Sequence, residues 1–162
     1  LNTSQGGIIM TSPVTVAPHK SSLGGLDANI WGLLAYLASG VLGLIPGIKY
    51  VAWLAPLVLY FLEKNSSFVK FHAMQAFCIN LLSAALSIIV AIIAAIAVAA
   101  SATSLAGLGG GLATLTITGV LTWIISIVVL VFEIIALVKA YKYQEYEIPG
   151  LGNLARAIMR KF

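Results

Sequence analysis

His72 and Gln75 are the polar side chains of this sequence best placed to carry chemistry. They lie three residues apart, so on a helix they share one face, at the start of a long apolar run. An imidazole and a carboxamide in apolar surroundings are costly unless they are paired. We therefore expect them either to bridge neighbouring helices or to belong to a proton relay or ligand-binding site. Asn80 adds a weakly polar position farther along the same run.

Glu133 is the one charged residue that falls well inside a predicted apolar helix. It lies six positions before Lys139, which is about 9 Å along a helix. An ionised carboxylate at that depth needs a partner or becomes neutral. We expect Glu133 to pack against the start of the third helix and to form a polar cluster with His72 and Gln75. Such a cluster would serve either as a structural clasp or in transport or proton handling.

The other candidates for catalysis or metal binding are weak. Cys78 lies in an apolar run without a neighbouring base, which is typical of an inert buried thiol. One cysteine and two histidines cannot supply the usual four-ligand zinc site, and no cofactor is expected. The glycine-rich stretch 107–111 has no following lysine, so it is not a phosphate-binding loop. The sequence therefore predicts a protein that is not an enzyme and binds no metal.

The composition indicates a protein of the lipid bilayer. Of the 162 residues, 60% are hydrophobic and only 9% are charged, and the mean hydropathy is +1.05. Soluble domains carry about 25% charged residues, so this chain lacks the polar side chains that a water-facing surface needs. The net charge of +4 comes mostly from basic residues beside apolar runs, as in topology signals. No nucleic-acid partner is expected.

The apolar runs predict an all-α polytopic membrane protein with four transmembrane helices. A transmembrane domain over 27–140 is expected to hold helices at about 28–45, 49–63, 70–100 and 114–139. The second run is too short for about 30 Å of hydrocarbon unless its flanks extend it, so it is either a crossing or one arm of a re-entrant hairpin. Residues 1–26 are expected to form a flexible polar tail, and residues 101–113 a turn.

Basic residues predict the orientation of these crossings. With the N-terminus inside, eight of the nine lysines and arginines lie on the inner side and only Lys49 lies outside. The positive-inside rule then places both termini in the cytoplasm, with the chain in the cell membrane. The cytoplasmic tail 141–162 ends in a short basic amphipathic helix, whose Arg156, Arg160 and Lys161 would face an anionic membrane surface. A frayed, solvated tail is the alternative.

A block between the second and third predicted helices resembles a known family. Its motif residues are Glu63, Lys64, Ser66, Phe68, Phe71, His72, Ala73 and Gln75. The block is similar to that of a widespread family of small four-helix membrane proteins of mostly unknown function. Relatives include the chloroplast inner-envelope import component of the Tic-twenty type and small magnetosome-membrane proteins. The resemblance implies four helices with both ends on one side, and a plastid inner membrane if the source is a plant or alga. It implies no mechanism.

These observations favour a non-enzymatic membrane protein that acts as an accessory or assembly subunit. Small residues along the third and fourth predicted helices would pack against each other, against a second copy or against other membrane subunits. The alternative is a channel or protein-translocation component with a polar path near His72, Gln75 and Glu133. A path requires these side chains to face a water-accessible cavity, whereas a scaffold requires them to be paired and dry.

Overall fold

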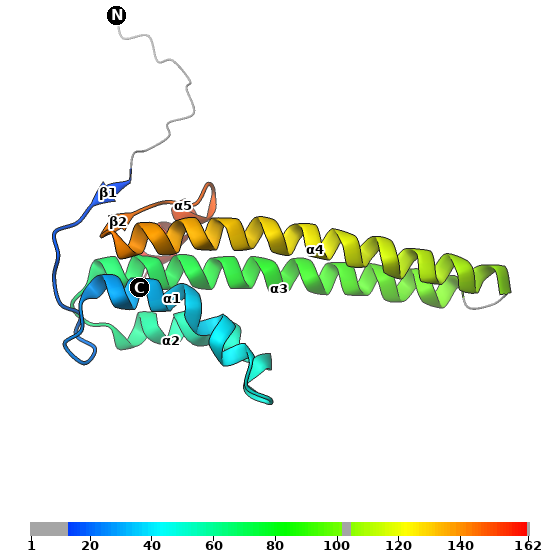
Figure 1. Ribbon diagram of the computed structural model, residues 1–162, viewed down its shortest axis with the longest axis horizontal. Coiled ribbons are helices and arrows are strands. Elements are labelled where there is room, and N and C mark those ends of the chain that lie inside the picture. The colour runs from blue at the N-terminus through cyan, green and yellow to red at the C-terminus, as the bar shows by residue number, and fades with distance from the viewer. Residues whose placement is uncertain (1–12, 102–104, 162) are drawn as a thin grey trace, which may run out of the picture.

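Two long helices dominate the fold. The structure, a computed structural model, describes residues 13–101 and 105–161 and is mostly helical. Helices α3 (Ser67–Ser101) and α4 (Leu105–Tyr141) run side by side as a long hairpin. The shorter α1 (Ala28–Gly43) and α2 (Ala55–Leu62) pack against the end of the hairpin where α3 begins (Figure 1). The opposite end of the hairpin extends beyond them.

The connection between α1 and α2 is a compact turn of two 3₁₀ segments. These are η1 (Ile48–Tyr50) and η2 (Ala52–Leu54), and Pro56 lies in the first turn of α2. Proline suits that position because the amide hydrogen it lacks has no partner inside the helix there. Together, η2 and α2 form a continuous apolar helical stretch over residues 52–62, which is only 11 residues long. It covers less than about 20 Å, whereas α3 extends for about 52 Å and α4 for about 55 Å.

The core lies at the end of the bundle where all the helices meet. Ser66 caps α3, because its Oγ accepts a hydrogen bond from the backbone N–H of Val69 at 3.1 Å. The first turns of α3 are then buried among α1, α2 and α4, whereas farther along α3 the large apolar residues from Leu81 onward are mostly exposed. Within residues 13–101 and 105–161, two helices, α3 and α4, are long and apolar enough to cross a membrane.

The turn predicted at residues 101–113 is corrected in part by the structure, and residues 102–104 lie outside the described ranges. Helix α4 begins at Leu105, so the glycine triplet 109–111 lies inside a helix. A helix satisfies the backbone N–H and C=O groups of this uncharged stretch without water. At Gly111 the two helices approach closely, because a Cβ there would lie 2.8 Å from the Oγ of Ser101.

The flexible tail predicted at residues 1–26 is also corrected in part. Strand β1 (Val14–Thr15) pairs antiparallel with β2 (Gln144–Glu145), which follows α4. The backbone then packs across the end of the bundle, with Ala28 N–H donating to the carbonyl of His19 at 2.9 Å. Residues 13–26 form an ordered strap because their polar groups bond to the bundle, while residues 1–12 lie outside the described ranges.

The C-terminal segment returns along α3. A left-handed Gly150 (φ 78°) starts α5 (Leu151–Met159), which packs against the buried half of α3. Because β1 pairs with β2, the two ends of the described chain lie at the same end of the hairpin.

Gly32 sets how closely α1 approaches the hairpin. A Cβ at this position would lie 3.1 Å from a ring carbon of Phe68 and 3.4 Å from the Cβ of Ala140. Gly40, two turns farther along α1, has no such neighbour within 4 Å. We expect Gly32→Val to separate α1 from α3 and α4 and to cost about 1–3 kcal/mol of stability.

Thermal unfolding in detergent checks this expectation, with Gly40→Val as the control for the intrinsic cost of valine in a helix. A lower midpoint for Gly32→Val than for Gly40→Val is expected. Equal midpoints would contradict the close packing at Gly32.

Candidate functional site

His72 and Gln75 meet through a tyrosine of α1. The hydroxyl of Tyr36 lies 3.0 Å from His72 Nδ1 and accepts a hydrogen bond from Gln75 Nε2 at 2.9 Å. The Tyr36 hydroxyl can therefore donate its own hydrogen to His72 Nδ1. His72 and Gln75 are 0% exposed and Tyr36 is 6% exposed. The two residues singled out from the sequence are thus joined in a buried cluster, which we call the clasp (Tyr36, His72 and Gln75), and the Nε2 of His72 has no hydrogen-bond partner among the described residues.

Gln75 also holds the C-terminal segment. Its Nε2 donates to the carbonyl of Tyr146 at 3.0 Å, and its Oε1 accepts from the backbone N–H of Ile148 at 3.1 Å. One carboxamide thus pairs with two backbone groups in the manner of a strand. Gly152 permits this approach, because a Cβ there would lie 3.0 Å from Gln75 Oε1 and 2.7 Å from the Cα of Glu147. The clasp therefore joins α1, α3 and the segment that follows α4.

Glu63 forms a second buried network with the strap. Its carboxylate accepts hydrogen bonds from the hydroxyls of Ser21 and Ser22 and from the backbone N–H groups of Asn65 and Ser66. The residue is 0% exposed. Burial alone would raise its pKa, but the donated hydrogen bonds outweigh this effect and lower the pKa of Glu63 to about 2. Glu63 is therefore a buried, charged anchor for residues 21 and 22.

The other family-motif residues surround these two networks. Ser66 caps α3 and also bonds His19, whose Nε2 lies 2.7 Å from its Oγ. The backbone N–H of Lys64 donates to Ser22 Oγ at 2.9 Å. The apolar members are all buried in the core, and they are Phe68, Phe71 and Ala73. The motif thus describes the start of α3 and its connections.

Arg156, predicted to face the membrane surface, forms ion pairs within the chain. Its guanidinium donates to Glu145 Oε2 at 2.8 Å and also to Glu147, and it lies over the ring of Phe71 at 4.3 Å. Carboxylates two residues apart on an extended segment face the same way, so both can reach one guanidinium. Arg160 and Lys161 are exposed at the end of α5, and their contact with lipid stays a prediction.

Glu133 is not part of the clasp. Among the described residues, no hydrogen bond links its carboxylate to His72 or Gln75. The small residues Ala136 and Ala140 occupy the surface of α4 that packs at the clasp, and both are 0% exposed. Glu133 lies about one turn farther from that end. The expected three-residue cluster is therefore divided between two places.

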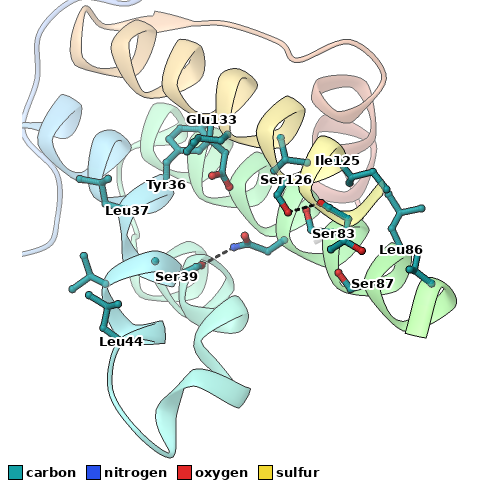
Figure 2. A pocket seen from close by; sticks show the side chains of 17 residues that line it. Tyr36, Leu37, Ser39, Leu44, Ser83, Leu86, Ser87, Ile125, Ser126 and Glu133 are labelled. Carbon is teal, nitrogen blue, oxygen red and sulfur yellow. Dashed lines mark hydrogen bonds between the residues drawn. The ribbon is translucent and has the colours of Figure 1, made fainter. Parts of the chain in front are cut away.

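A cavity of about 680 Å³ lies between α1, α3 and α4, and Glu133 lines it. Figure 2 shows the Glu133 carboxylate pointing into this space beside Tyr36. Asn80 lines the same cavity and donates to Ser39 Oγ at 2.6 Å. Two of the four polar positions picked from the sequence thus belong to the clasp, and the other two, Asn80 and Glu133, line the cavity. We call this space the Glu133 cavity.

The sequence interpretation missed Tyr36, Ser21 and Ser22. Tyr36 stands in an apolar run, where a tyrosine hydroxyl usually finds a partner when buried, and this was the available signal. The serines lie in a polar stretch that looks like an ordinary tail, and no local pattern connects them to Glu63. Within the described ranges, no three His, Cys, Asp or Glu side chains gather in a way that could hold a metal.

Comparison with known proteins finds relatives among membrane proteins. Residues 27–155 match the magnetosome magnetite crystal formation protein family. The chain is 30% identical over 138 residues to the UPF0132 membrane protein MJ1527 of Methanocaldococcus jannaschii. The aligned region covers 85% of this chain and 74% of the relative. It is 31% identical over 136 residues to the UPF0132 membrane protein MJ1443 of the same organism, in an alignment that covers 84% of this chain and 91% of that relative. No solved structure matches the chain.

Stability should depend on the charge of Glu63. The folded state lowers the pKa of this carboxyl from 4.5 to about 2. The ionised carboxyl therefore adds to the free energy of unfolding above pH 4.5, and this stabilisation is lost as the pH falls toward 2. This difference in pKa between the unfolded and the folded state corresponds to about 3 kcal/mol of the free energy of unfolding at neutral pH. We expect Glu63→Gln to be less stable than the wild type at pH 7 and to approach it at pH 3.

Unfolding in detergent measured from pH 7 to pH 3 checks this prediction, with Asp27→Asn as a control at an exposed ion pair. If the difference in unfolding free energy between the wild type and Glu63→Gln stays constant across this range, Glu63 is not held in the ionised form by its network.

Proposed function

This chain belongs to the magnetosome magnetite crystal formation protein family, and we propose that it is a non-enzymatic accessory or assembly subunit of a membrane complex or homo-oligomer. The family is one of membrane proteins involved in magnetosome formation, and the relatives in Methanocaldococcus jannaschii are named only as membrane proteins. Contact with the lipid bilayer follows from the family. The role as a subunit, in a homo-oligomer or in a larger complex, is our own proposal.

The observation that carries this proposal is that His72 and Gln75 are fully buried and hydrogen-bonded within the clasp. A catalytic or transport role for His72 and Gln75 would need them to meet a substrate or water. Instead both are 0% exposed, and their hydrogen bonds go to Tyr36 and to the backbone after α4. Polar groups used in this way hold helices together. The alternative is a channel or translocation path near His72, Gln75 and Glu133. Of these three residues, Glu133 alone lines the cavity.

The free end of the hairpin supports a role in assembly. In α3 and α4, the most apolar windows are only 6% buried within the chain. Isoleucines and leucines along these helices are largely exposed, among them Ile92, Ile96 and Ile117. This surface must be covered by lipid acyl chains or by other membrane helices. Seen in this way, one end of the molecule folds on itself and the other is presented to the membrane.

The helix lengths support a modified topology. We propose that α3 and α4 cross the bilayer completely, while α1 and α2 form the re-entrant hairpin that the sequence left open as the alternative to a second crossing. The apolar stretch 52–62 is too short for about 30 Å of hydrocarbon. Both ends of the chain then lie on one side, in agreement with the pairing of β1 with β2. The positive-inside rule favours the cytoplasm for that side.

Assembly can be tested on the full chain in nanodiscs by native mass spectrometry. We expect more than one copy per particle, or a stoichiometric membrane-protein partner after mild extraction from the native membrane. Glu133→Gln should leave the composition unchanged, because Glu133 is not part of the clasp. A particle with a single copy and no stoichiometric partner would contradict the proposal, as would flux through liposomes that Glu133→Gln abolishes.

The topology can be tested with single cysteines and a membrane-impermeant thiol reagent. The native Cys78 is buried and gives the background. We expect Gly110→Cys, near the end of the hairpin, to be labelled from the side opposite the termini. Lys49→Cys should not react from that side, because the α1–α2 hairpin stops short of it. Equal labelling of both positions from that side would show four complete crossings.

A further inference from the structure

The Glu133 cavity is lined by oxygen atoms on one side. Besides the Glu133 carboxylate, hydroxyls of Ser83, Ser87, Thr122 and Ser126 line it. Thr122 and Ser126 donate to backbone carbonyls one turn earlier, each at 2.8 Å, so the lone pairs of their oxygens are the groups left to offer. The buried Oγ of Ser83 has no hydrogen-bond partner among the described residues. Figure 2 labels Ser83, Ser87 and Ser126 among the residues that line this space.

The Glu133 carboxyl has no positive partner among the residues that line the cavity, so it is either neutral or paired with a cation that the chain does not supply. Glu133 is the only charged residue among those lining it, and no lysine or arginine is among them. A carboxylate between membrane helices is expensive without a positive partner. Asn80, the nearby donor, uses an amide hydrogen on Ser39. The polar side of the cavity therefore suits a group that brings one positive charge and several N–H donors.

The remaining walls are apolar and the space is large. Leu37 and Val41 of α1 and Leu86 and Val90 of α3 also line it. A volume of about 680 Å³ is much larger than a bare ion needs and lies within the range of cavities that hold small organic molecules, about 300–1,000 Å³. A single carboxylate also matches one charge, whereas divalent cations prefer several charged oxygen ligands. The shape and lining therefore fit an amphiphilic molecule.

We propose that the Glu133 cavity binds an organic ammonium group carried on an aliphatic body. The ammonium donates to the Glu133 carboxylate and to the hydroxyl oxygens, and the aliphatic part lies against the apolar walls. Such a group can come from a free alkylamine or from the headgroup of phosphatidylethanolamine, since both present a primary ammonium. This site goes beyond the proposed function, because a scaffold role needs no ligand here.

Octylammonium binding to the full chain in nanodiscs of phosphatidylcholine and phosphatidylglycerol tests the proposal. We expect saturable binding of one molecule per chain above the linear partition into lipid, weakened at least tenfold in Glu133→Gln. Asp27→Asn is the matched control, since it removes an acid far from the cavity and should bind as the wild type does. Octanol, which has the same chain without the charge, should show partition only.

A second arm distinguishes the two sources. If phosphatidylethanolamine is the occupant, adding it to the nanodiscs should compete with octylammonium, and native mass spectrometry should find it retained by the wild type but not by Glu133→Gln. If a free amine is the occupant, octylammonium binding should be unchanged by that lipid. Equal binding to the wild type and Glu133→Gln, or saturable binding of octanol, would overturn the proposal. The number of chains per particle, measured in the same spectra, tests the proposed function separately.

Discussion

A buried polar group in an apolar bundle must find a partner, and Gln75 is the group on which most of this structure depends. Its carboxamide contacts Tyr36 of α1 and the backbone at Tyr146 and Ile148, which follow α4. Those partners lie 39 and more than 70 residues away in the sequence. In a setting where apolar burial alone gives helices little reason to associate, such hydrogen bonds specify which surfaces meet. Gly152 permits the approach of the C-terminal segment to Gln75, and Gly32 permits the approach of α1 to Phe68 and His72.

A consequence of this arrangement is that the polar groups gather at one end of the hairpin. The strap is fixed there by the buried carboxylate of Glu63, and the C-terminal segment is fixed by Gln75 and by the ion pairs of Arg156. Among the described residues, the far end of α3 and α4 presents apolar and small side chains and threonines whose hydroxyls bond to the backbone. The division of the molecule into a folded end and a membrane-facing end therefore follows from where the few polar residues can be satisfied.

The helical class and the importance of residues 63–75 could be predicted from the sequence, because long uncharged runs and isolated polar residues within them carry clear physical costs. The partners of these residues could not. Tyr36 was visible only as an aromatic residue in an apolar run, and Ser21 and Ser22 belong to a stretch whose composition is typical of a tail. Order in the strap comes from Glu63, which is more than 40 residues away. The glycine triplet likewise suggests a turn locally, yet the absence of nearby polar partners favours a helix there.

The central claim is that Tyr36 and Gln75 stabilise the fold by bonding to each other. A double-mutant cycle with Tyr36→Phe, Gln75→Leu and the combined variant, followed by unfolding in detergent, measures this directly. We predict that the two effects are not additive and that the interaction free energy exceeds about 0.5 kcal/mol. Additive losses, within the error of the measurement, would show that the two side chains stabilise the protein independently and would contradict the account.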